Sequence, residues 1–82
     1  FSTTNLKVFP NPSNQFINIE LGKKVEVPYS ITIYSSIGKQ LFFESDHLEK
    51  KLKIEYKLPK ELCLIVVQDK NNELYTLSVI NK

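Results

Sequence analysis

Two side chains in the sequence have the chemistry of a nucleophile and its base, the single cysteine Cys63 and the single histidine His47. A Cys–His pair generates a reactive thiolate when the thiol is exposed and its pKa is low. Cys63 instead lies inside the apolar run 62–66, where burial would raise the pKa of a thiol. We therefore interpret Cys63 as a small buried apolar residue, and His47, within the polar stretch 45–47, as a solvated loop residue.

Other catalytic and metal-binding patterns are missing from the sequence. A structural zinc site needs about four nitrogen or sulfur ligands, whereas one cysteine and one histidine supply two at most. The sequence contains no Gly-x-Ser-x-Gly elbow, calcium loop, phosphate-binding loop or dinucleotide motif. Asp46 and Asp69 both fall in expected turns, where an aspartate side chain commonly bonds to the backbone. We predict a non-enzymatic domain with no metal and no cofactor.

The composition describes one small domain whose charge is nearly balanced. In 82 residues, 11 lysines against 9 acidic residues give a net charge of +2, and arginine is absent. Without the bidentate guanidinium that reads bases and phosphates, we predict no nucleic-acid partner. Lysines in segment 50–60 could form a basic patch for an anionic partner, but solubility and edge protection explain them better. No apolar run approaches the ~20 residues of a membrane-spanning helix, so we predict no transmembrane segment.

Apolar and polar residues alternate along much of the chain, which is the period of half-buried β-strands. Ile17, Ile19 and Leu21 share one face of the clearest segment. The sequence predicts strands at 6–9, 16–21, 29–34, 39–44, 48–56, 62–68 and 74–80. Segment 62–68 is apolar on both faces, which is typical of a central strand.

Turn residues separate these segments at short intervals. Gly38 can supply the positive φ of a tight hairpin, and Asn71 and Asn72 tolerate the left-handed conformation that a hairpin loop needs. Short strands, frequent turns and no helical period together predict an all-β fold, a seven-stranded antiparallel sandwich.

Three sequence blocks together resemble the C-terminal sorting domains of the type IX (Por) secretion system, type A. The first block is Leu6–Pro10 followed by Asn11 and Pro12, and the second is Tyr29–Tyr34 followed by Gly38 and Lys39. The third is Leu58 and Pro59, a hydrophobic strand, a polar loop and a final strand that ends at Lys82. Glu61 and Cys63 stand where family members usually carry glycine and an aromatic residue.

The resemblance implies an immunoglobulin-like sandwich that acts as a non-catalytic export signal in Bacteroidetes-type bacteria. It implies an N-terminal cargo, transit through the periplasm, an outer-membrane translocon and a surface sortase, with the cell surface or the medium as destination. We expect a linker at 1–5, with the sortase cutting in or before it, and the sorting domain at 6–82. Because the chain begins with Phe1, we also expect it to be a piece of a longer protein. The motif positions expected to carry recognition are Pro10, Asn11, Pro12, Gly38, Lys39, Leu58, Pro59, Ile80 and Lys82.

Our hypothesis is that the machinery recognises a folded surface made by the corner at 10–12 and the terminal strand at 74–82. The alternative is an immunoglobulin-like spacer or adhesive module that stays on the mature surface protein. An enzyme with an exposed Cys63 near His47 is the third reading.

Overall fold

The computed structural model describes residues 2–10 and 15–80, and these residues fold into strands joined by turns and loops. No helix among them has the length and apolar character needed to cross a membrane. The strands are β1 (Leu6–Pro10), β2 (Phe16–Leu21), β3 (Tyr29–Tyr34), β4 (Gln40–His47), β5 (Lys51–Glu55), β6 (Leu62–Gln68) and β7 (Leu74–Ile80).

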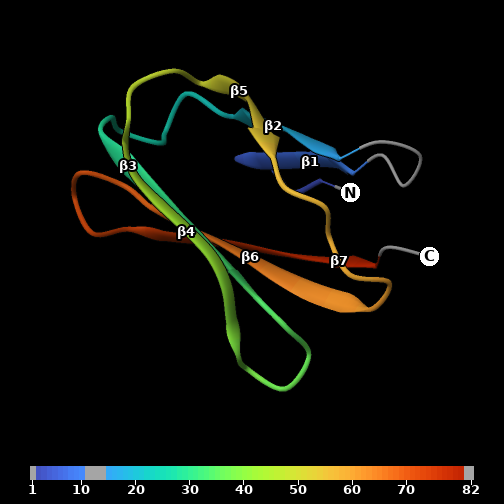
Figure 1. The fold of residues 1–82 in the computed structure, drawn as a ribbon. Helices are drawn as coiled ribbons and strands as arrows, with labels where there is room; N and C mark the ends of the chain where they lie inside the picture. Colours follow the sequence, from blue (N-terminus) through green and yellow to red (C-terminus); the bar gives the residue numbers. More distant parts are fainter. Residues whose placement is uncertain (1, 11–14, 81–82) are drawn as a thin grey trace.

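The strands form two antiparallel sheets that face each other (Figure 1). The smaller sheet has the order β1-β2-β5 and the larger has the order β4-β3-β6-β7. In an immunoglobulin constant-type domain the fourth strand pairs with the first sheet, whereas here β4 pairs with β3. The predicted all-β, seven-stranded antiparallel sandwich of immunoglobulin-like type is confirmed.

The core lies between the sheets and consists of the residues that the alternation placed inward. Ile17 and Ile19 of β2 and Ile65 of β6 all belong to this core, and each of the three is at most 1% exposed. The predicted inward face of β3 is likewise buried from Tyr29 to Ile33 at every second residue. Cys63 is 1% exposed, which confirms its interpretation as a buried apolar residue. These interdigitated faces remove the apolar surface of both sheets from water.

The prediction of a polar break at residues 45–47 was wrong, because these residues belong to β4. The strand is at the edge of its sheet and pairs only with β3, so its polar side chains can stay in solvent while its backbone bonds. Asp46 adopts φ 61°. The β3–β4 pairing shifts register between Tyr29 and Ile31 and again between Ile33 and Tyr34. The strand expected at 48–56 is shorter than predicted, since β5 covers only Lys51–Glu55.

Two turns have the positive backbone φ angles that their residues predict. Gly38 has φ 85° between β3 and β4, and Ser35 closes that hairpin by donating its N–H to the Lys39 carbonyl at 2.8 Å. Asn72 has φ 64° in the loop between β6 and β7. Both values lie in the left-handed region that glycine and asparagine adopt at low cost.

The outer faces of the two sheets differ in charge. On the smaller sheet, Lys7 of β1 lies across from Glu20 of β2, which lies across from Lys51 of β5. Lys53 on the same face sits over the Phe16 ring, with its Nζ 3.9 Å from the ring centroid. The outward residues of β3, β6 and β7 are uncharged, and they are Ser30, Thr32, Tyr34, Leu62, Leu64, Val66, Gln68, Leu74, Thr76, Ser78 and Ile80.

The central position predicted for segment 62–68 is confirmed, since β6 lies between β3 and β7. Only one of its faces is covered, however. The side chains of Cys63, Ile65 and Val67 are buried, whereas Leu62 is 46% exposed and Leu64 is 37% exposed. Its apolar outer face therefore lies open.

Candidate recognition surface

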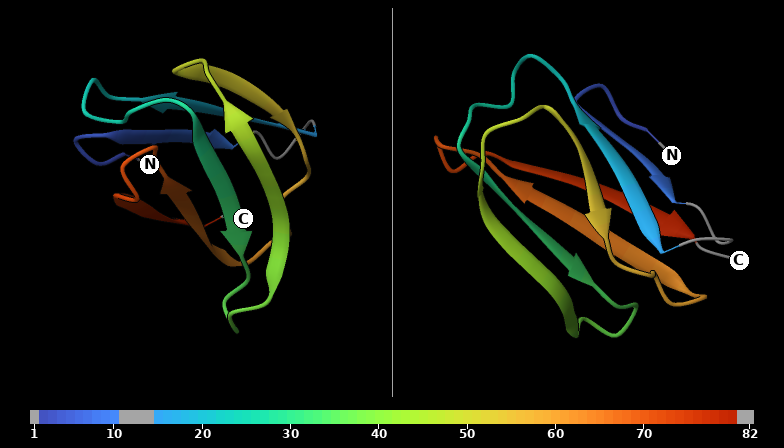
Figure 2. Two further views of the ribbon diagram at one scale, coloured as in Figure 1. Left: turned by 90° about the vertical axis from the view of Figure 1, so that its left-hand side faces the viewer. Right: turned by 45° about the horizontal axis from the view of Figure 1, so that its top comes forward.

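The described motif positions gather at one end of the sandwich, which we name the motif end. It comprises the end of β1, the β3–β4 turn (35–39), the β5–β6 loop (56–61) and the end of β7. Figure 1 and the right-hand panel of Figure 2 show these strand ends and turns on the same side of the molecule. The β2–β3, β4–β5 and β6–β7 connections lie at the opposite end.

The pairing registers account for this convergence. In the larger sheet, Tyr34 at the end of β3 pairs with Leu64 of β6, which pairs with Ser78 of β7. In the smaller sheet, Pro10 at the end of β1 pairs with Ile17, and β2 pairs with β5 on its other side. Antiparallel pairing therefore brings together segments that are far apart in the sequence.

The individual positions contribute in different ways. Pro10 ends β1, and Gly38 and Lys39 form the turn after β3. Leu58 is 4% exposed and belongs to the core, so it anchors the β5–β6 loop rather than offering a contact. Ile80 is 47% exposed at the end of β7. The predicted positions Asn11, Pro12 and Lys82 lie outside the described residues.

Hydrogen bonds join two of the segments at this end. Ser36 donates both its N–H and its hydroxyl to Oε1 of Glu61, each at 3.1 Å. Glu61 therefore ties the β5–β6 loop to the β3–β4 turn. Its charge also adds to burial in raising the pKa of the Cys63 thiol.

A pocket of about 300 Å³ opens beside this contact, and we name it the end pocket. Its mouth lies on the uncharged outer face, between the β3–β4 turn and the start of β6. It is lined by Tyr34, Ser35, Ser36, Gly38, Leu62, Cys63, Leu64 and Ser78. Sequence reasoning missed this pocket and the open face around it. The detectable signal was the lack of any charged residue in segments 62–68 and 74–80.

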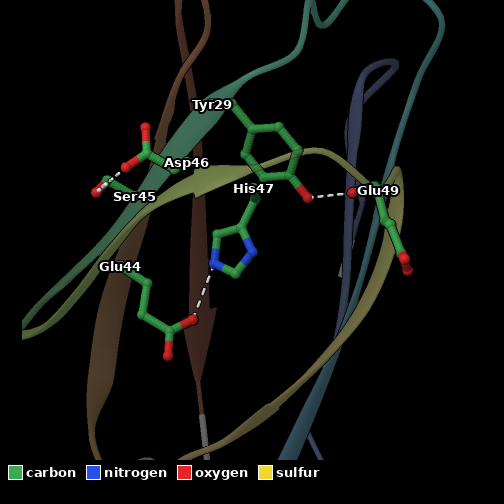
Figure 3. Close-up of polar contacts among 6 residues, drawn as sticks. All are labelled: Tyr29, Glu44, Ser45, Asp46, His47 and Glu49. Atoms are coloured by element: carbon green, nitrogen blue, oxygen red, sulfur yellow. Dashed lines mark hydrogen bonds and ion pairs between the residues drawn. The ribbon is translucent and has the colours of Figure 1, made fainter.

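His47 is not a solvated loop residue, contrary to the sequence interpretation. It lies in β4 and stacks on Tyr29 with ring centroids 5.5 Å apart, while its Nε2 lies 2.8 Å from Oε1 of Glu44 (Figure 3). The Tyr29 hydroxyl donates to the Glu49 carbonyl. Burial, together with the Glu49 charge, raises the pKa of Tyr29 to about 12. This cluster closes the end of the sandwich opposite the motif end.

Cys63 and His47 do not form a pair. His47 pairs with Tyr29 at the start of β3. Cys63 is next to Leu64, which pairs with Tyr34 at the end of β3. At 3.3 Å per strand residue, the two are separated by about 16 Å or more along the sheet. Burial raises the pKa of the Cys63 thiol, which opposes nucleophilic chemistry. Within residues 2–10 and 15–80, no three His, Cys, Asp or Glu side chains are grouped so that they could hold a metal ion.

Residues 7–81 match a known protein family that is described as a secretion system C-terminal sorting domain. The chain belongs to this family. It is thus a type IX sorting domain, as the three sequence blocks predicted. The family is a sorting signal and is not a catalytic family. No curated protein matches the chain.

Membership of the family places the sorting domain in a general biological context. A type IX sorting signal interacts with the secretion machinery. It directs export across the outer membrane to the cell surface. The charged face of the smaller sheet, the uncharged outer face of β3, β6 and β7, and the motif end are surfaces of the described fold.

Proposed function

We propose that the sorting domain carries an N-terminal cargo through the periplasm to the type IX translocon of the outer membrane, which binds the motif end. The observation that carries the proposal is the family match over residues 7–81, together with the convergence of the described motif positions at one end. The domain itself performs no catalytic step in this proposal.

Recognition of a folded shape follows from the distribution of the motif along the chain. Pro10, Gly38, Pro59 and Ile80 come from four separate segments, and only the two sheets bring them to one end. An unfolded chain would present these residues as unrelated fragments. A partner that contacts several of them at once therefore binds the native sandwich much better than the unfolded chain, and this preference itself stabilises the fold.

A surface sortase then separates the cargo from the domain at the linker, residues 1–5, leaving 6–82 as the released sorting unit. Ser2, Thr3 and Thr4 are exposed, as a protease substrate requires. Thr3 donates its N–H to the Leu6 carbonyl at 2.8 Å, and Ser2 forms a single bridge with Lys7. Such short-range contacts can open locally without unfolding the sheets.

The test fuses this chain to the C-terminus of a fluorescent reporter with a periplasmic leader, in a bacterium that has a type IX system. The intact fusion should reach the cell surface or the medium, and deletion of 77–82 should leave the reporter in the periplasm. Equal surface delivery of both fusions would overturn the proposal. Deletion of 2–4 serves as the control for the signal, because these residues contact the start of β1 and belong to none of the motif positions.

Mass spectrometry of the exported reporter tests the removal step against the alternative of a retained spacer. Removal predicts that peptides from 6–82 are missing from the mature reporter and that its new C-terminus lies in or before the linker. Recovery of these peptides on the surface-exposed reporter would identify the domain as a retained immunoglobulin-like module instead.

A further inference from the structure

In the part of the chain that the structure describes, the sandwich has four edge strands, and β7 differs from the other three. An edge strand offers unpaired N–H and C=O groups, and proteins usually block it with charges, proline, bulges or a covering segment. β7 is seven residues long, keeps an unbroken register with β6 and contains no charged residue, proline or glycine. It is therefore a long, regular edge without charge, proline or a bulge. Among the described residues, β1 of the facing sheet comes near this strand but does not pair with it.

Each of the other edges carries at least one blocking feature. The β1 edge is partly covered by the bridge between Ser2 and Lys7, and Pro10 ends the strand. The β4 edge is interrupted by register shifts and carries charged residues that include Asp46. β5 has only five residues, and Lys51 lies on its exposed face with Lys53 and Glu55. The contrast marks β7 as the edge best suited to pair with a further strand, with β1 near it but not paired to it.

The free backbone groups of β7 belong to its outward residues. Asp69 donates its N–H to the Glu73 carbonyl at 3.0 Å, which makes them a hydrogen-bonded pair. Because such pairs alternate along an antiparallel ladder, Tyr75, Leu77 and Val79 bond to β6. The residues between them turn their N–H and C=O groups to the free edge, and these are Leu74, Thr76, Ser78 and Ile80. All four are exposed.

The end pocket lies next to this edge. Ser78 lines it from β7, and Leu62, Leu64 and Tyr34 line it from the two strands behind. Serine is small, so a side chain from a strand beside β7 could pass over Ser78 toward the leucines. A pocket of about 300 Å³ is large enough for one aromatic or leucine side chain.

We propose that β7 accepts an extended strand of a protein of the secretion machinery, which adds a fifth strand to the β4-β3-β6-β7 sheet. This inference rests on the proposed function and deepens it. Main-chain hydrogen bonds to Thr76 and Ser78 supply affinity, and a large apolar side chain placed over Ser78 in the end pocket supplies specificity. The outward side chains of the incoming strand are uncharged, so that they extend the uncharged outer face of β3, β6 and β7.

A second copy of this chain fits the edge less well than such a partner. Two β7 edges would contribute seven residues each, whereas stable protein interfaces use about 20–30 residues on each side. A strand from the secretion machinery can extend its contact to the neighbouring motif end, because Ile80 at the end of β7 pairs with Leu62 beside the β5–β6 loop.

The test compares Thr76→Pro with Thr76→Val in the reporter fusion described above. Proline removes an N–H that faces the free edge and keeps every β6–β7 hydrogen bond, whereas valine keeps the N–H and the side-chain shape. We expect Thr76→Pro to lower surface delivery about tenfold, from a lost main-chain bond and a steric clash, and Thr76→Val to match the wild type. Circular dichroism and thermal unfolding of the 82-residue chain confirm folding.

Thr76→Lys provides a second variant if the proline variant does not fold. A lysine on an edge strand opposes pairing without perturbing the sheet. Ser45→Lys is its matched control, since it adds the same charge to an exposed position on the opposite edge of the same sheet, away from the motif end. We expect export to fall for Thr76→Lys alone. Ser78→Phe, which fills the end pocket from β7, should also lower export.

The outcomes separate this inference from the proposed function. Export of the folded Thr76→Pro and Thr76→Lys variants at the wild-type level would overturn strand addition and leave the proposed function intact. Failure of the wild-type fusion to be exported would overturn both. A dimer in analytical ultracentrifugation that Thr76→Lys dissociates, with export unchanged, would assign the edge to a second copy and overturn the proposed partner. Unchanged export of Ser78→Phe would overturn the role of the end pocket.

Discussion

The Asp69 carboxylate accepts a hydrogen bond from the main-chain N–H of Glu26, which lies 43 residues earlier, at 3.2 Å. Its other oxygen accepts the N–H groups of Asn71 and Glu73 at 2.9 and 3.0 Å, and the residue is 4% exposed. The side chain therefore holds the β6–β7 loop in shape and fastens it to the β2–β3 loop across the end opposite the motif end.

Asp69 makes the stability of the domain depend on pH. Burial alone would raise the pKa of this carboxyl, but the hydrogen bonds from Glu26, Glu73, Asn71 and Tyr75 outweigh burial and lower it. A lowered folded-state pKa stabilises the fold at pH values above the unfolded pKa of about 3.9, and this contribution is lost as pH falls through the folded value.

Asp69→Asn should remove this dependence. We expect the free energy of unfolding, measured with urea at pH 7 and pH 3, to fall with acid less steeply in Asp69→Asn than in the wild type. The variant should also be less stable at pH 7. Asp46→Asn, at the exposed aspartate of β4, is the matched control. Equal acid dependence of wild type and Asp69→Asn would show that this carboxylate has no such role.

Replacing Gly38 by a residue with a side chain should lower the stability of the domain through backbone conformation alone. Its φ is 85°, and a Cβ placed there would meet no heavy atom within 4 Å. Gly38→Ala should therefore cost about 1–2 kcal/mol of unfolding free energy from the left-handed backbone. Gly38→Asn should cost less, because asparagine tolerates this region. Thermal unfolding of the two variants checks this order, and a stability of Gly38→Ala equal to that of the wild type would contradict it.

The Ser36–Glu61 contact should couple the turn and the loop at the motif end. In a double-mutant cycle of Ser36→Ala and Glu61→Gln, we expect a coupling energy of about 0.5–1 kcal/mol, the range for a partly exposed contact to a charged group. The coupling should shrink in high salt. Strict additivity of the two substitutions would mean that the contact does not stabilise the native state.

Cys63 should resist thiol reagents in the native state. The residue is 1% exposed, and burial together with the Glu61 charge raises the pKa of its thiol. Labelling with a maleimide at pH 7.5 should proceed only as fast as the domain opens, and should be immediate in denaturant. Ile37→Cys in a Cys63→Ala chain, at a position that is 87% exposed, should label at once. Rapid labelling of native Cys63 would contradict its burial and would favour the hypothesis of an enzyme with an exposed Cys63.

The sequence predicted best those parts of the fold that local alternation and turn residues determine. The β3 segment Tyr29–Tyr34 and the positive φ of Gly38 are examples, because a period of two and a glycine in a hairpin each reflect short-range sterics. The strand character of Ser45 and Asp46 escaped prediction, since an edge strand can keep polar side chains in water while its backbone pairs.

Long-range relationships were beyond sequence reasoning for a different reason. The hydrogen bond between the Glu26 N–H and the Asp69 carboxylate depends on how the two sheets pack. No local sequence pattern near either residue predicts it. The convergence of the motif positions likewise follows from strand order. The family resemblance identified these positions, but only the fold shows that those it describes share one end.

The central claim is that the secretion machinery reads the domain as a folded shape. Ile65→Asp tests it most directly, because it places a carboxylate at a position that is 0% exposed and leaves every motif residue in the sequence. The substitution should unfold the domain. Gln68→Asp, at an exposed position of the same strand, is the control that should stay folded and be exported. We predict that the Ile65→Asp fusion stays in the periplasm, and its delivery to the surface at the wild-type level while unfolded would contradict the account.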